Sequence, residues 1–89
     1  MKKNVGSILL PKNGTTLRYY VFGSRKKGFG VQIMRCYGEQ VVQSEISSHL
    51  TYDWPSARDF AHSLARGAVF PDSLKEICED YRFGMSIAD

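Results

Sequence analysis

The sequence predicts an α+β domain, in which an antiparallel meander sheet of three to four strands is followed by a two-helix hairpin packed on one face. Residues 4–46 alternate apolar and polar side chains with a period of two, and short turns rich in glycine divide them. Residues 53–83 carry apolar side chains at helical spacing instead. Because no helical pattern separates the strands, we expect antiparallel pairing rather than βαβ units.

The first hairpin is predicted from Asn13-Gly14, which lies between the apolar runs 4–10 and 15–23. Asn-Gly is the strongest short-range hairpin signal, because both positions of such a two-residue turn adopt positive φ. With this turn, Leu10 faces Leu17 across the strand pair.

The rest of the meander follows from the next two glycine-bearing turns. Residues 23–28 read Gly-Ser-Arg-Lys-Lys-Gly and form a charged turn, after which residues 29–36 return as the third strand. Residues 37–39 turn again, and residues 40–46 form a fourth, weaker strand.

The first helix starts at Asp53 or Ser56, either of which can serve as the N-cap, and it stops at Gly67. Its apolar stripe consists of Ala57, Phe60, Ala61, Leu64, Ala65 and Ala68.

The second helix has a capping-box pattern at its start, Ser73-x-x-Glu76, and Gly84 as its terminator. We therefore expect one domain over residues 1–89, with a β-meander in 1–46, a helical hairpin in 53–83 and a tail in 84–89.

Charge is segregated along the chain. The net charge is +3, yet no acidic residue precedes Glu39. A region of one sign selects binding partners through its field, although it does not determine the fold. The basic residues before Glu39 are Lys2, Lys3, Lys12, Arg18, Arg25, Lys26, Lys27 and Arg35.

The two faces of the predicted sheet differ in chemistry. One face is the expected core, with Ile8, Leu10, Leu17, Tyr19, Val21, Val31 and Ile33. The opposite face mixes aromatic, amide and guanidinium groups, and basic residues lie close to it. Reversing the register would exchange the two faces. The candidate binding residues are Arg18, Tyr20, Phe22, Arg25, Lys26, Lys27, Gln32, Met34 and Arg35.

This combination favours a small non-enzymatic binding module that acts on a protein partner or on a second copy of itself, because exposed aromatic residues are commonly buried in interfaces. A nucleic-acid-binding protein is the first alternative, since bases stack on aromatic rings and basic side chains neutralise phosphates. A phage or mobile-element inhibitor of a nucleic-acid enzyme, similar to anti-CRISPR proteins, is the second, and its target would be a nucleoprotein enzyme.

The sequence offers no chemistry for catalysis. It has no nucleophile elbow and no phosphate-binding loop, and its cysteines and histidines lack metal-ligand spacing. We therefore expect no catalytic residue, no metal, no cofactor and no small-molecule substrate. No apolar run approaches the length of a membrane span, so we expect no membrane partner. Two cysteines far apart, Cys36 and Cys78, favour reduced thiols and a cytoplasmic location.

Several short motifs are spread along most of the chain. They are Gly14-Thr15-Thr16-Leu17-Arg18-Tyr19-Tyr20, a strand ending in Ile46-Ser47, Asp53, a Pro-bearing helix start, Phe60 with Leu64, an apolar link with Phe70-Pro71, and Leu74-x-x-Ile77-x-Glu79-Asp80-Tyr81. Together they resemble a family of short uncharacterised proteins from clostridia and related Firmicutes. The resemblance implies no activity, and the chain departs from the family pattern at Arg25-Lys26-Lys27 and at Trp54.

Overall fold

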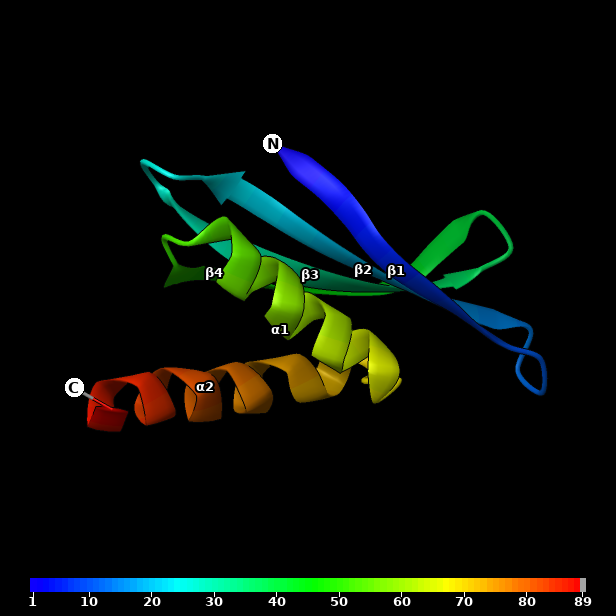
Figure 1. Cartoon of the computed structure of the whole chain (residues 1–89). Coiled ribbons are helices and arrows are strands. Elements are labelled where there is room, and N and C mark those ends of the chain that lie inside the picture. Colours follow the sequence, from blue (N-terminus) through cyan, green and yellow to red (C-terminus); the bar gives the residue numbers. More distant parts are fainter. Residues whose placement is uncertain (89) are drawn as a thin grey trace.

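Four antiparallel strands form one sheet in the order β1-β2-β3-β4, and both helices lie on the same face of it (Figure 1). The computed structural model describes residues 1–88, and the side chains of residues 1–81. This arrangement confirms the predicted α+β class. The elements are β1 (Lys2–Leu10), β2 (Thr15–Ser24), β3 (Gly28–Tyr37), β4 (Gln40–Thr51), α1 (Trp54–Arg66), the 3₁₀ turn η1 (Pro71–Ser73) and α2 (Leu74–Ala88).

The turn between β1 and β2 contains four residues rather than the expected two. Leu10 pairs with Thr15, and Ile8 rather than Leu10 pairs with Leu17. Of the two turn residues that were expected to have positive φ, Gly14 has a φ of 61° and Asn13 is not among the positive-φ residues. The predicted two-residue turn is therefore wrong. Because the register shifts by two positions, the side chains of residues 6–10 stay on their expected face.

The β2–β3 pairing follows the prediction, with Val21 opposite Val31 and Tyr19 opposite Ile33. These four side chains and Leu17 are fully buried, and the helices supply the rest of the core. The face predicted as core is thus the face that the helices cover. The helical contribution to this core comprises Ala57, Ala61, Leu64, Leu74 and Cys78.

A β-bulge at Val5 changes which side chains of β1 face the helices. The register shifts between Asn4 and Gly6, so the pairing continues as Lys3 opposite Val21 and Lys2 opposite Phe22. An extra residue in one strand reverses the alternation beyond it. Lys3 therefore lies on the helix side of the sheet, and Lys2 lies on the open side.

β4 is longer than predicted and bends around Gly30. Phe29 pairs with Thr51 and Val31 pairs with Ser47, so residues 48–50 lie opposite Gly30 alone. A Cβ on Gly30 would collide with the carbonyl oxygen of Ser47 and would stand 2.8 Å from the Phe22 ring. Gly30 therefore allows β4 to approach β3 closely at this point.

α1 begins as predicted, because the Asp53 carboxylate caps it by accepting the backbone N–H of Ser56 at 3.0 Å. At its other end Gly67 has ordinary helical backbone angles, and Ala68 takes the left-handed position with a φ of 49°. The left-handed residue that follows the helix is therefore Ala68, one position after the glycine that usually takes this conformation.

α2 differs from the prediction at both ends. Ser73 lies inside η1, and it makes no capping hydrogen bond to Glu76 among the described side chains. Its backbone N–H instead reaches the carbonyl of Phe70 at 3.1 Å. The helix also continues past Gly84 to Ala88, because one interior glycine costs only about 1 kcal/mol and leaves helical angles accessible. Of the expected tail, Asp89 lies outside the described residues.

Tyr19 joins the centre of the sheet to the link between the helices. Its hydroxyl donates a hydrogen bond to the carbonyl of Val69 at 2.9 Å, and burial raises the pKa of this phenol to about 12. Its ordinary value is 10.0. As the pH rises above 10, the unfolded state loses this proton first, so the folded state loses stability progressively up to a pH of about 12 and does not regain it at higher pH.

We expect Tyr19→Phe to lower the free energy of unfolding at neutral pH by about 1–3 kcal/mol, because the Val69 carbonyl loses its donor. This deficit should shrink between pH 10 and about 12, where only the wild type has the raised phenol pKa. Urea unfolding of both proteins at several pH values measures this difference in the free energy of unfolding. A deficit that stays constant with pH contradicts the assignment.

Gly30→Ala should lower the free energy of unfolding by roughly 1–3 kcal/mol, since the new Cβ forces β4 away from β3. Gly67→Ala is the matched control, because its φ is −84° and its Cβ would meet Val69 at an ordinary 3.5 Å. Thermal unfolding compares the two variants. Equal effects would show that the close approach at Gly30 is unimportant.

Candidate functional site

One face of the sheet has no helix over it, and we call it the open sheet face. Arg18 pairs with Met34, and Tyr20 pairs with Gln32, on the side opposite the buried Leu17, Tyr19 and Val21 positions. This set is the binding platform that the sequence predicts, because alternation along β2 and β3 places its members together. The large apolar, amide and basic side chains of the open sheet face are Lys2, Leu9, Arg18, Tyr20, Phe22, Gln32, Met34 and Ile46.

Apolar side chains on this face are unusually accessible. Leu9 is 65% exposed and Ile46 is 57% exposed, while Tyr20, Phe22 and Met34 are half-buried. Large exposed apolar groups on one face of a small domain mark an interaction surface.

The charge on the open sheet face is basic. Glu45 is the only acidic residue in the four strands, and it pairs with Ile33, which places it on the helix side. Lys2 stands with its Nζ 4.7 Å from the centre of the Tyr20 ring, a cation–π contact that covers this aromatic plane. Gln32 donates a hydrogen bond to Ser44 Oγ at 2.9 Å. The face therefore presents apolar groups between two cations, Lys2 and Arg18.

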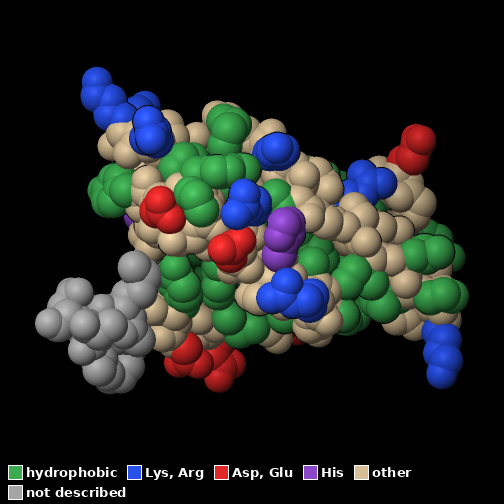
Figure 2. All heavy atoms as spheres, in the orientation of Figure 1, with side chains coloured by type: hydrophobic (Ala, Val, Ile, Leu, Met, Phe, Trp, Pro, Cys, Tyr) green, Lys and Arg blue, Asp and Glu red, His purple; other side chains and the backbone are tan. Residues whose placement is uncertain are grey.

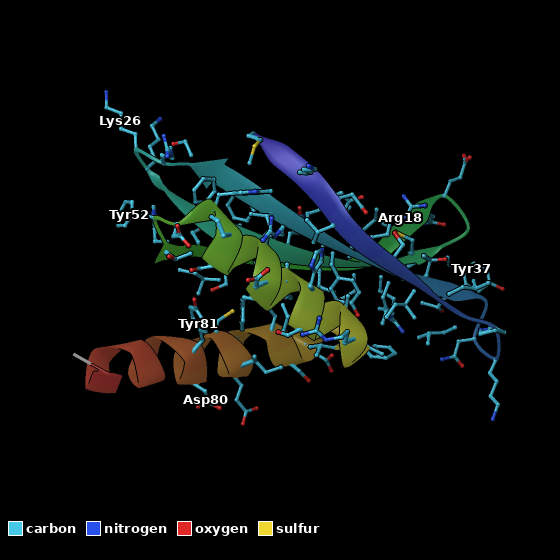
Figure 3. All side chains as sticks on the ribbon, in the orientation of Figure 1. Arg18, Lys26, Tyr37, Tyr52, Asp80 and Tyr81 are labelled. Atoms are coloured by element: carbon cyan, nitrogen blue, oxygen red, sulfur yellow. The ribbon has the colours of Figure 1, made fainter. Side chains whose placement is uncertain are left out.

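The predicted basic turn, Arg25-Lys26-Lys27, is fully exposed at one end of the sheet, and Lys26 extends into solvent (Figure 3). Its backbone is held in two places. The Lys27 N–H donates to Ser24 Oγ at 3.0 Å, and His49 Nδ1 donates to the Lys27 carbonyl at 3.1 Å. These two hydrogen bonds fix the backbone that carries the three cations. Arg25 lies on the helix side of the sheet, beside Trp54, rather than on the open sheet face.

Arg35 does not belong to the predicted site. It pairs with Leu17 on β2 and with Gln43 on β4, so it lies on the helix side of the sheet. Its Nε is buried and has no hydrogen-bond partner within the described residues. The alternation that places Val31 and Ile33 in the core already assigns Arg35 to the same side.

A groove of about 520 Å³ lies at the turn end of the molecule, between the start of α1 and the end of β2. The Phe29 and Trp54 rings meet edge to face in it, with centroids 5.7 Å apart. Lys3 Nζ stands 5.7 Å from the Trp54 ring centre. Figure 2 shows hydrophobic side chains exposed among basic ones at this end. The lining residues are Met1, Lys3, Gly23, Ser24, Arg25, Phe29 and Trp54.

Hydrogen bonds fix the walls of the groove. The Gly23 N–H donates to the Met1 carbonyl at 2.9 Å, which ties the start of the chain to the end of β2. The Asp53 carboxylate accepts both the backbone N–H and the hydroxyl of Ser56, and these bonds lower its pKa below the ordinary value of 3.8. The cations of Arg25 and Arg58 lower it further.

Acidic side chains gather elsewhere, on the outer side of α2. Glu76, Glu79 and Asp80 are exposed there, and Asp80 points away from the sheet, whereas Tyr81 points inward and packs on Phe60 (Figures 2 and 3). The molecule therefore presents its basic groups and its acidic helix on different surfaces.

The chemistry available at these surfaces is that of binding. Among the described side chains, no group of three or more His, Cys, Asp or Glu residues could hold a metal ion. Cys36 and Cys78 are both buried and are not joined in a disulfide. Neither helix, over the residues that the structure describes, is long and apolar enough to cross a membrane.

Residues 9–83 match the model of a family of unknown function, DUF6514. The chain belongs to this family. The match agrees with the resemblance to a family of uncharacterised proteins, whose bacterial range stays a prediction. No curated protein and no solved structure matches the chain. Membership in DUF6514 therefore supplies a family without an activity, and the function must be argued from the surfaces above.

The groove was missed by sequence reasoning. Trp54 stood out only as a departure from the family pattern, and Lys3 as part of a basic run. The bulge at Val5, which turns Lys3 toward Trp54, has no sequence signal that pattern reading detects. A tryptophan at the first position of a helix, directly after a strand, was the one available indication.

Asp53→Asn should preserve α1 but remove its acid sensitivity, because asparagine also caps helices and does not titrate. In the wild type, the lowered pKa of Asp53 contributes stability above pH 3.8, and this contribution is lost as the pH falls through the lower folded value. Unfolding followed by circular dichroism between about pH 6 and pH 2 tests this. Identical acid dependence in both proteins contradicts the assigned role.

Proposed function

We propose that this chain is a small non-enzymatic binding module whose open sheet face docks on a protein. The observation that carries the proposal is the one-sided coverage of the sheet, which leaves Leu9 and Ile46 more than half exposed on a face that also holds Tyr20, Phe22 and Met34. Burying such a face removes apolar surface from water and stabilises a complex.

The details of the face favour a protein over a nucleic acid. A base needs an accessible aromatic plane, yet the Tyr20 ring is covered by the Lys2 ammonium group. Only two cations, Lys2 and Arg18, accompany the apolar groups, which gives little attraction for a phosphate backbone. The exposed Leu9 and Ile46 are suited to an apolar protein surface.

Charge also favours a different protein over a second copy. A two-fold dimer through the open sheet face would bring two basic faces together, because isologous contact pairs a surface with itself. Lys2 and Arg18 have no acidic neighbour on that face. We therefore propose a partner with an apolar patch bordered by acidic side chains. A cytoplasmic location is part of the proposal, supported by two buried cysteines that are not joined in a disulfide.

Ile46→Asp should abolish partner binding, because it places a charge in the apolar patch that binding would bury, while removing a side chain that is 57% exposed and contributes little to folding. Tyr52→Asp is the matched control, since Tyr52 is 68% exposed and follows β4 outside the open sheet face. Quantitative affinity capture from lysate of the source organism, with nuclease present, compares the three proteins.

The proposal expects a protein that the wild type and Tyr52→Asp capture and that Ile46→Asp loses at least about tenfold. Binding that disappears with nuclease would point to nucleic acid instead. Light scattering on the purified chain tests self-association. A doubled mass that returns to the monomer mass in Ile46→Asp would show that the partner is a second copy of this chain. If no captured protein depends on Ile46, the proposal is wrong.

A further inference from the structure

The groove at the turn end is a second surface, separate from the open sheet face. Its aromatic floor comes from Phe29 and Trp54, both on the helix side of the sheet. Its rim carries two cations, Lys3 and Arg25. The bulge at Val5 determines which lysine each surface receives, because it places Lys2 on the open side and Lys3 at the groove.

We propose that this groove binds an acidic peptide segment of another protein, which inserts one aliphatic or aromatic side chain between Trp54 and the end of β2. The inference does not depend on the proposed function, because the groove shares none of its lining residues with the open sheet face.

The lining of the groove selects an apolar anchor. The Phe29 and Trp54 rings and the Met1 side chain are apolar, and the Ser24 hydroxyl is already engaged by the Lys27 N–H. Few polar groups remain to orient a polar ligand. A groove of about 520 Å³ is large enough for one bulky side chain together with its neighbouring peptide units.

The rim selects negative charge beside that anchor. In the described part of the chain, neither Lys3 nor Arg25 forms an ion pair; the single pair present there is Arg58 with Asp59. The nearby Asp53 carboxylate is hydrogen-bonded to Ser56 at the helix start, and it attracts Arg25 through its charge without forming an ion pair with it. Carboxylates flanking an apolar anchor would pair with them as the anchor is buried.

The arrangement favours a peptide over a single-stranded nucleic acid. Stacking needs an open aromatic plane, but Lys3 lies over the Trp54 ring and the Phe29 ring meets it edge to face. A carboxylate can draw the Lys3 ammonium group outward while an apolar side chain takes the space beside the rings. Complementary charge at the rim then fixes the register of the peptide.

Trp54 makes the test site-specific, because it is the only tryptophan of the chain and its emission reports on the groove. The probes are acetylated and amidated pentapeptides, Glu-Glu-X-Glu-Glu, with Leu, Ile, Phe or Ala at the centre. We expect a saturable change of Trp54 emission with the large apolar residues, and binding roughly tenfold weaker with Ala. Binding should also weaken between about 50 mM and about 500 mM salt.

Two double variants locate the charges. Lys3→Gln with Arg25→Gln should weaken binding at least about fivefold, since both rim cations are lost. Lys12→Gln with Arg66→Gln is the matched control, because it removes one exposed lysine and one exposed arginine away from the groove, and it should bind like the wild type. Ile46→Asp should bind these peptides normally, which separates this inference from the proposed function.

Any of three results would overturn the inference. The first is no change of Trp54 emission with any of the peptides up to about 1 mM, the weakest affinity that a specific contact would show. The second is that the wild type binds Lys-Lys-Leu-Lys-Lys as tightly as the acidic peptides, or that the Lys3→Gln, Arg25→Gln variant binds the acidic peptides as tightly as the wild type does. The third is tighter binding of oligothymidylate than of any acidic peptide, which would assign the groove to single-stranded nucleic acid. Circular dichroism confirms that each variant is folded.

Discussion

Both helices pack on the same face of the four-stranded sheet, and this arrangement determines the rest of the molecule. The helices bury Leu17, Tyr19 and Val21 completely, so the alternate residues of the same strands must face away from the core. Within the described residues 1–88, no further helix or strand covers them. The same packing of the helices therefore determines both the core and the open sheet face, so a change of register would alter the residues of both.

Two irregularities of the backbone, in β1 and in β4, then determine where the exposed cations lie. The bulge at Val5 places Lys2 on the open side and Lys3 on the helix side, where each lies over a different aromatic ring. The bend of β4 around Gly30 brings His49 onto the carbonyl of Lys27, which braces the basic turn. Both features place cations beside apolar groups, and the resulting surfaces combine hydrophobic contact area with charge that can select a partner.

Period-two alternation and helical spacing predicted the α+β class, the pairing of Val21 with Val31 and the face that forms the core, because burial imposes these patterns on the sequence. The shared position of Arg18, Tyr20 and Met34 followed from the same rule. Arg35, which was predicted together with them, lies instead on the helix side of the sheet, in agreement with strand alternation.

The groove and the length of β4 could not be predicted, since bulges arise from local backbone choices that leave no periodic signal. The four-residue turn before Thr15 was missed for a related reason, because Asn-Gly is compatible with more than one turn length. The same bulges have a further consequence for the outermost strands. β1 and β4 are the edge strands of the sheet, and an edge strand is a template on which strands of other molecules can pair. Because both strands are interrupted, at Val5 and opposite Gly30, neither offers a long regular template, and the protein can display an apolar sheet face while resisting strand-by-strand aggregation.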